Sequence, residues 1–98
     1  MFYNLIVHPD ANKELSALTK SQIILVYKQF KKISKSPELG QLLGNKNNYD
    51  LSGCRKMYVD KKRIRIVYQI IEDKIVVEVI AIGKRDDMEV YANASLRV

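Results

Sequence analysis

The spacing of apolar and polar positions changes midway along the chain. Before about residue 37 apolar residues recur three or four positions apart, whereas from about residue 54 they occur in alternating runs rich in Val, Ile and Tyr. The first spacing is typical of amphipathic helices and the second of half-buried strands. The pattern therefore predicts an α+β protein, with helices in its first half and a sheet in its second.

A strand and two helices are predicted in the first half. A β-rich run over residues 2–8 stops at Pro9, a weak helix follows over residues 9–18, and the clearest helix covers residues 20–36. The candidate caps are Asp10 for the first helix and Thr19 or Ser21 for the second. The apolar side of the second helix is predicted to comprise Ile23, Ile24, Val26, Tyr27, Phe30 and Ile33.

The second half is predicted to form an antiparallel meander. The strand candidates are residues 54–59, 62–71 and 74–82, joined by tight hairpins at Asp60-Lys61 and Glu72-Asp73. Gly83 is expected to end the last strand. The stretch before the meander, residues 37–50, is interpreted as an irregular connection, and residues 86–97 as a short terminal helix or ordered tail. The expected fold is thus an N-terminal strand and two helices packed on a small, mainly antiparallel sheet, with a short C-terminal helix.

Length and charge narrow the function classes. The 98 residues fit one domain, 1–98, and the net charge of +6 favours polyanions or acidic protein partners, although a basic surface also serves solubility alone. No apolar run approaches a membrane span, and the N-terminus lacks a secretory pattern, so a cytoplasmic protein without membrane contact is expected. With one Cys and one His, we expect no disulfide, no metal site and no cofactor.

Basic side chains gather on the predicted strands. Strand alternation places Lys56 and Tyr58 on one face of the first strand, and Arg63 and Arg65 on one face of the second. If those faces coincide, the cluster suits a phosphate, because Arg and Lys both donate to phosphate oxygens. A solvated strand face is the alternative. Further along, the run Gly83-Lys84-Arg85 and then Tyr91 could extend the site at the end of the sheet.

Several segments together resemble a known family. They are Leu51-Ser52-Gly53-Cys54-Arg55-Lys56, Arg63-Ile64-Arg65-Ile66-Val67-Tyr68-Gln69-Ile70, Gly83-Lys84-Arg85 and Glu89-Val90-Tyr91. In this combination the chain resembles the RelE branch of the RelE/ParE toxin superfamily. The resemblance implies a type II toxin, an mRNA interferase that enters the 70S ribosome and cleaves messenger RNA at the decoding site. It also implies a cognate antitoxin partner, with DNA bound only through the complex with that antitoxin.

The resemblance assigns roles residue by residue. By position Lys56, Arg65, Arg85 and Tyr91 match family catalytic residues, and Tyr58 stands where a second catalytic lysine is found. It implies metal-independent attack by the ribose 2′-hydroxyl on the phosphate. Our hypothesis is that the two arginines clamp the phosphate, Lys56 stabilises it or takes a proton, and Tyr91 orients or stacks on a base. Arg63 and Lys84 are expected to bind RNA beside this site.

Other groups and functions carry weaker expectations. The helix lysines Lys28, Lys31 and Lys32 form either a solvated face or a contact with ribosomal RNA. His8 is interpreted as a strand-end residue and Cys54 as an apolar strand residue, although each type can serve in catalysis. Two alternative functions stay open: a ParE-like inhibitor of DNA gyrase, and a basic binding module without catalysis.

Overall fold

A computed structural model describes residues 2–46, 48–84 and 89–98. Its elements in chain order are β1 (Asn4–Val7), α1 (Pro9–Ser16), α2 (Lys20–Lys35), the 3₁₀ turn η1 (Pro37–Leu39), β2 (Gln41–Lys46), β3 (Tyr49–Val59), β4 (Ile64–Ile71), the 3₁₀ turn η2 (Glu72–Lys74), β5 (Val76–Lys84) and α3 (Glu89–Arg97). Among the described residues, no helix is long and apolar enough to span a bilayer.

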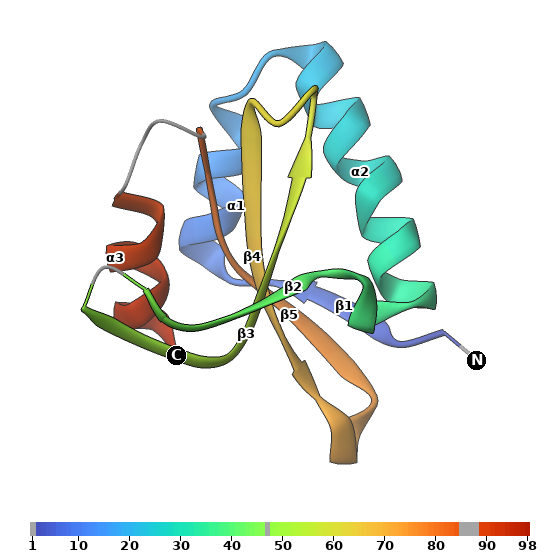
Figure 1. The fold of residues 1–98 in the computed structure, drawn as a ribbon. Coiled ribbons are helices and arrows are strands. Elements are labelled where there is room, and N and C mark those ends of the chain that lie inside the picture. The colour runs from blue at the N-terminus through green and yellow to red at the C-terminus, as the bar shows by residue number, and fades with distance from the viewer. Residues whose placement is uncertain (1, 47, 85–88) are drawn as a thin grey trace.

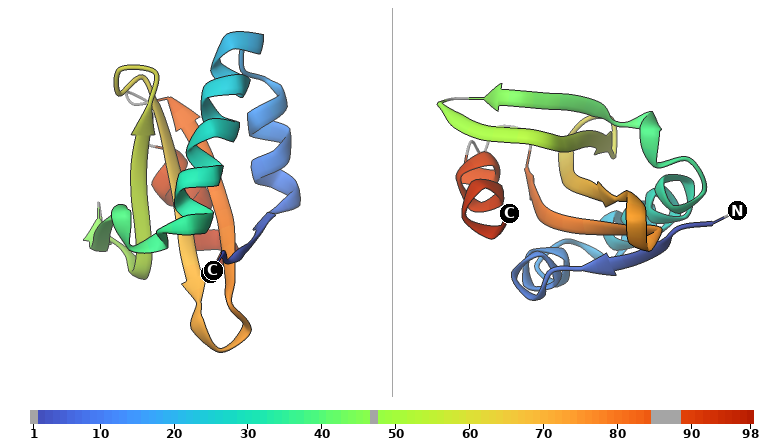
Figure 2. Two further views of the ribbon diagram at one scale, coloured as in Figure 1. Left: turned by 90° about the vertical axis from the view of Figure 1, so that its right-hand side faces the viewer. Right: turned by 90° about the horizontal axis from the view of Figure 1, so that it is seen from below.

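The strands form a single mixed sheet in the order β1-β5-β4-β3-β2. Strands β2 to β5 pair with one another antiparallel, and β1 joins the edge of β5 in parallel (Figure 1). Helices α1 and α2 lie on one face of the sheet, and α3 lies on the other (Figure 2). The predicted α+β fold, with its antiparallel meander and terminal helix, is confirmed.

Local capping explains where the first two helices begin. The cap of α1 is His8, not Asp10 as the sequence predicts: the His8 Nδ1 accepts a hydrogen bond from the Asp10 amide at 3.1 Å. For α2 the cap is Thr19, whose hydroxyl accepts from the Gln22 amide while the Gln22 side chain accepts from the Thr19 amide. This reciprocal pair satisfies two amides that lack a partner within the helix.

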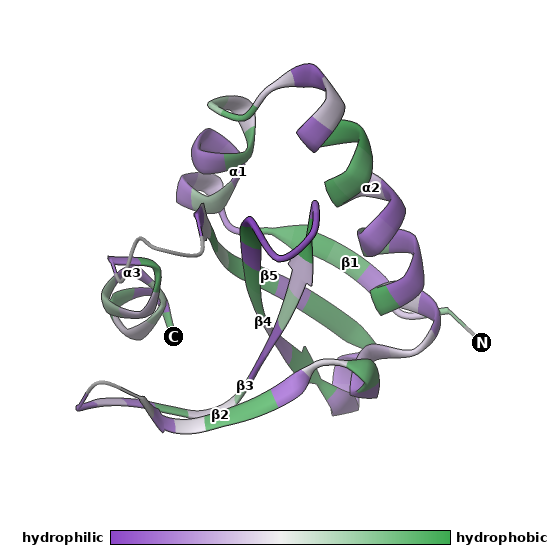
Figure 3. Cartoon of the chain, turned by 45° about the horizontal axis from the view of Figure 1, so that its top comes forward, coloured by the Kyte–Doolittle hydropathy of each residue, from purple (hydrophilic) through white to green (hydrophobic). Residues whose placement is uncertain are grey.

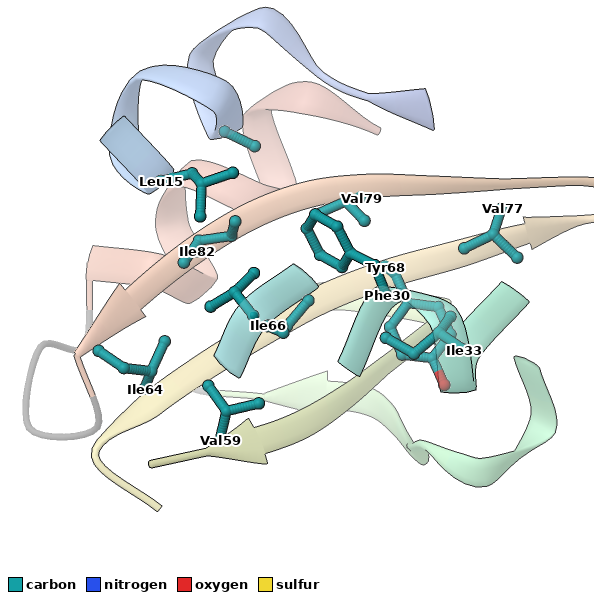
Figure 4. Packing of buried hydrophobic residues seen from close by; sticks show 12 residues of the cluster. Leu15, Phe30, Ile33, Val59, Ile64, Ile66, Tyr68, Val77, Val79 and Ile82 are labelled. Carbon is teal, nitrogen blue, oxygen red and sulfur yellow. The ribbon is translucent and has the colours of Figure 1, made fainter. Parts of the chain in front are cut away.

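The larger core lies between α1, α2 and the sheet. Its buried residues come from both helices and from β3, β4 and β5 (Figure 4): Ala11, Leu15, Val26, Phe30, Ile33, Val59, Ile64, Ile66, Tyr68, Val77, Val79 and Ile82. Two residues of the predicted apolar side of α2 do not join it, because Ile24 and Tyr27 lie more than half exposed. The helical period identifies the apolar stripe of α2, but how many of its residues are buried depends on the sheet that packs against it.

A smaller core lies beneath α3 on the other face. It contains Leu51, Cys54, Val67, Ile80, Ala81, Val90, Tyr91 and Ala94. Gly83 does not end β5 as predicted; it pairs with Arg65 and β5 continues to Lys84. A Cβ on Gly83 would lie 3.0 Å from the Val90 Cβ, so the glycine permits close packing of α3 on β5.

The connections also differ from the predicted ones. Residues 41–46, assigned to an irregular connection, form β2 because they pair with β3. Both hairpin loops are longer than predicted, since the last ladder pairs are Val59 with Ile64 and Ile71 with Val76. The β3–β4 loop is hydrophilic throughout and projects from the end of the sheet (Figure 3).

Tyr68 connects the larger core to η1. Its ring is fully buried, and its hydroxyl accepts from the Gly40 amide at 2.8 Å and donates to the Pro37 carbonyl at 2.6 Å. Burial, the largest influence, raises the pKa of this phenol. Arg55, opposite Tyr68 in the ladder, donates to the Gly40 carbonyl at 2.7 Å and to the Glu38 carbonyl at 3.1 Å.

We expect Tyr68→Phe to lower the free energy of unfolding by about 1–3 kcal/mol, because it leaves a buried amide and a buried carbonyl without the hydroxyl. Urea unfolding measures the change. The matched control is Tyr27→Phe, because Tyr27 is 53% exposed. This change should alter the free energy of unfolding by less than about 0.5 kcal/mol. Equal stability of the two variants would contradict this role for Tyr68.

Candidate active site

The register of β3 and β4 brings three predicted site residues to one face of the sheet. Tyr58 lies directly opposite Arg65, and Lys56 lies opposite Val67. The neighbouring residues Val59 and Ile64 enter the larger core, so the three polar side chains project from the opposite face, away from α1 and α2. The sequence left open whether the two basic faces coincide, and the register shows that they do.

These side chains contact one another closely. The Lys56 ammonium donates to the Tyr58 hydroxyl at 3.1 Å and lies 5.1 Å from the centre of the Tyr58 ring. The Arg65 guanidinium carbon lies 5.5 Å from the Tyr58 ring centre and 4.8 Å from that of Tyr91. The guanidinium therefore contacts two aromatic rings, one from β3 and one from α3, an arrangement that stabilises a desolvated cation.

The cluster has an accessible part and a buried part. Lys56 and Tyr58 are partly exposed, whereas Arg65 is only 6% exposed and Tyr91 only 1%. The Tyr91 ring packs in the smaller core and against Arg65, and its expected role of orienting or stacking on a base stays a prediction. Arg65 brings a fixed positive charge close behind Tyr58, because a guanidinium does not lose its proton in proteins.

The two cations change the chemistry of the phenol between them. The hydrogen bond from Lys56 is the largest influence on Tyr58 and lowers the pKa of its phenol, and Arg65 adds a hydrogen bond and a Coulombic attraction in the same direction. Partial desolvation opposes this effect. At a given pH the phenolate of Tyr58 is therefore more populated than that of an ordinary tyrosine.

The other predicted RNA-binding residues lie apart from this cluster. Arg63 is in the β3–β4 loop, largely exposed, with its Nη1 4.0 Å from Asp60 Oδ2. Lys84 pairs with Ile64, so it projects from the opposite face to Arg65. The exposed lysines of α2 (Lys28, Lys31 and Lys32) lie across the sheet from the site. Arg85 lies outside the described residues.

A polar junction that the sequence did not reveal fixes α3 beside the site. The Glu14 carboxylate of α1 accepts from Arg97 Nη1 at 2.8 Å, from Asn93 Nδ2 at 3.2 Å and from the Ile82 amide of β5 at 3.1 Å. Arg97 also donates to the Ile80 carbonyl at 2.9 Å. One carboxylate thus joins α1, β5 and α3, and α3 carries Tyr91 to Arg65.

The single histidine caps a helix and the single cysteine packs in a core. His8 follows β1 directly and caps α1, which agrees with its interpretation as a strand-end residue, and β1 lies at the edge of the sheet beyond β5. Cys54 is a buried free thiol in the smaller core, where burial raises its pKa. Among the described residues, no group of three or more His, Cys, Asp or Glu side chains is arranged to hold a metal ion.

The chain matches known proteins over most of its length. Residues 5–89 match the family model described as the ParE toxin of type II toxin-antitoxin systems. A putative RelE-like toxin of Escherichia coli is 32% identical over the whole chain and 99% of its own length. The mRNA interferase toxin RelE of Escherichia coli K12 is 44% identical over 45 residues, which cover 46% of this chain and 47% of that protein.

Solved structures extend the similarity to the fold. The free form of a mutant Escherichia coli RelE toxin aligns with a TM-score of 0.82 at 32% identity, covering 100% of this chain and 99% of that one. The same mutant toxin in complex with a peptide of the antitoxin RelB aligns with a TM-score of 0.72 at 32% identity, covering 96% of this chain and 95% of that one.

The fold and the comparisons define a toxin of the type II toxin–antitoxin class within the RelE/ParE superfamily. Inside that superfamily, the chain belongs to the RelE branch.

We expect Tyr58 to titrate below the usual phenol value of about 10, because Lys56 and Arg65 stabilise its phenolate. The difference in ultraviolet absorbance between the parent protein and Tyr58→Phe, followed against pH, isolates this phenol. In Lys56→Met the midpoint should rise, since the strongest stabilising hydrogen bond is gone. A Tyr58 midpoint at or above the ordinary value in the parent would refute this account of the cluster.

Proposed function

We propose that this toxin is a ribosome-dependent endoribonuclease that cleaves messenger RNA in the ribosomal A site. The observation that carries the proposal is the cluster of Lys56, Tyr58 and Arg65, which sets two cations around a partly exposed phenol on one face of the sheet. A polyanion fits this charge, and the net charge of +6 attracts it over a longer range. The similarity to a toxin named as an mRNA interferase supports RNA as the polyanion.

In the proposed reaction the ribose 2′-hydroxyl attacks the adjacent phosphate. The products are a 2′,3′-cyclic phosphate and a free 5′-hydroxyl, so the protein forms no covalent bond with RNA. Its tasks are to position the RNA, to stabilise the charge that builds on the phosphate and to move protons. Lys56 contacts the phosphate directly, and the buried charge of Arg65 adds a fixed field in a region shielded from water.

The remaining family positions complete the proposed site. Tyr91 holds Arg65 in place through the contact of its ring with the guanidinium. Arg85, by the resemblance of Gly83-Lys84-Arg85 to the family, supplies the second guanidinium for the phosphate. We assign no metal to the reaction, because ammonium and guanidinium groups provide the positive charge. Treating the toxin with a chelator and removing the chelator before the assay should leave the cleavage rate unchanged.

The proposed partners follow from the same chemistry. Besides the ribosome and messenger RNA, we propose a cognate antitoxin, which is supported by the similarity to a RelE toxin solved with an antitoxin peptide. An acidic, amphipathic segment complements a protein of charge +6. The toxin would act in the cytoplasm and reach DNA only within the antitoxin complex. Co-purification with the product of a neighbouring gene tests this partner.

We expect Lys56→Ala and Arg85→Ala each to reduce cleavage of ribosome-bound message about 100-fold or more, because each removes a charged donor from the reacting phosphate. The rate is measured under single-turnover conditions on programmed ribosomes, with the 5′ ends mapped. Lys74→Ala, which removes an exposed charge in η2 at the other end of β4, should cleave like the parent. Parent rates in both site variants would show that the site is elsewhere.

A second candidate function has its own support, because the family model that matches is that of ParE toxins. A ParE-like toxin would inhibit DNA gyrase and would not need the charged cluster. Gyrase supercoiling in the presence of the toxin separates the two candidates. We expect no inhibition; inhibition together with intact messages would favour the second function.

The α2 lysines allow a separate prediction about affinity. If Lys28, Lys31 and Lys32 bind ribosomal RNA phosphates, their triple change to alanine weakens binding to ribosomes. The slope of log affinity against log salt concentration then becomes shallower by about 0.9 for each phosphate that is no longer neutralised. The cleavage rate of the bound complex should not change, because these lysines lie across the sheet from the site. An unaltered affinity and slope would mean that they form a solvated face.

A further inference from the structure

We propose that the phenolate of Tyr58 is the general base that takes the proton from the substrate 2′-hydroxyl, an inference that rests on the proposed ribonuclease function. The family resemblance leaves this role open, since Tyr58 occupies the position of a catalytic lysine. The structure provides the reason to assign it to the phenol.

The hydrogen-bonding capacity of the cluster leads to this assignment. In their charged forms Lys56 and Arg65 carry donors and no acceptor, so neither can take a proton. Tyr91 has a hydroxyl, but this residue of α3 is only 1% exposed and packs in the smaller core, which keeps it from RNA in this arrangement. Tyr58 is partly exposed and its oxygen has lone pairs, which makes it the proton acceptor of these four groups.

The groups around Tyr58 favour its phenolate, which is the form that can accept a proton. Lys56, on the same strand, donates to the phenol oxygen at 3.1 Å, and Arg65, opposite on β4, lies over the ring. From α3 comes Tyr91, whose ring centre is 4.8 Å from the Arg65 guanidinium carbon. Together Lys56 and Arg65 lower the pKa of the phenol, so the base form is populated at lower pH than in free tyrosine.

The proposed reaction needs only the RNA, Tyr58 and solvent water to account for every proton and bond. The proton of the 2′-hydroxyl passes to the Tyr58 oxygen while the 2′-oxygen forms its bond to phosphorus. The bond between phosphorus and the 5′-oxygen then breaks, and that oxygen keeps the electron pair and takes a proton from water. Tyr58 returns its proton to solvent. Lys56 stays an ammonium throughout and donates to the phenolate before the transfer.

The first test is Tyr58→Phe, which keeps the ring that Lys56 and Arg65 contact and removes only the hydroxyl. Single-turnover cleavage on saturated ribosomes should fall by about 100-fold or more, the usual contribution of a positioned base, while ribosome affinity stays that of the parent. The control is Tyr27→Phe, an equivalent change on the exposed side of α2, which should retain the parent rate. A Tyr58→Phe rate within about threefold of the parent overturns the proposal, because a positioned base contributes far more.

The second test distinguishes a base from a group that only positions RNA. With 3-fluorotyrosine at position 58, whose phenol is more acidic and similar in size, the rising limb of the pH–rate profile should move to lower pH. In Tyr58→Phe that limb should disappear. A limb that stays in place in both variants overturns the proposal even if the rate falls. A parent protein that leaves ribosome-bound message intact would instead refute the ribonuclease function itself.

Discussion

The pairing of β3 with β4 is the constraint on which both the core and the site depend. With Val59 opposite Ile64 and Tyr58 opposite Arg65, apolar side chains enter the larger core and the charged cluster projects from the other face. A slip of β3 by one residue would turn Lys56 and Tyr58 toward the aliphatic core and Val59 away from it. The free energy of burying the core therefore also fixes the geometry of the proposed active site.

The loop that joins these strands is held from outside the sheet. Asp60, Lys61 and Lys62 all have positive φ angles, a conformation that residues with side chains adopt rarely. The Arg63 amide donates to the Asp60 carbonyl at 3.0 Å, and the Gln22 side chain of α2 donates to the Asp60 carboxylate at 3.1 Å. Gln22 also completes the α2 cap, so the start of that helix and the end of the hairpin share an anchor.

Local pattern explains what could be predicted and what could not. The period of two correctly put Lys56 and Tyr58 on one face of β3, because alternation needs no knowledge of distant residues, whereas their meeting with Arg65 depended on the register of β3 and β4. Strand β2 was not predicted, because its sequence, Gln-Leu-Leu-Gly-Asn-Lys, has no β-branched residue. The strand forms through its hydrogen bonds with β3. The junction at Glu14 joins residues up to 83 positions apart, and no local sequence pattern predicts such a contact. The burial of Arg65 and Tyr91 likewise depends on where α3 packs.

The junction between Glu14 and Arg97 has a consequence for the order of events during synthesis. Chains emerge from the ribosome with the N-terminal end first, so α1 and the sheet precede α3. Glu14 acquires its guanidinium partner, and Arg65 its second aromatic ring, only after the residues of α3 have been added. The complete cluster is therefore assembled last, and a nascent chain that has not reached α3 presents Tyr58 and Arg65 without the contact that holds the guanidinium in place.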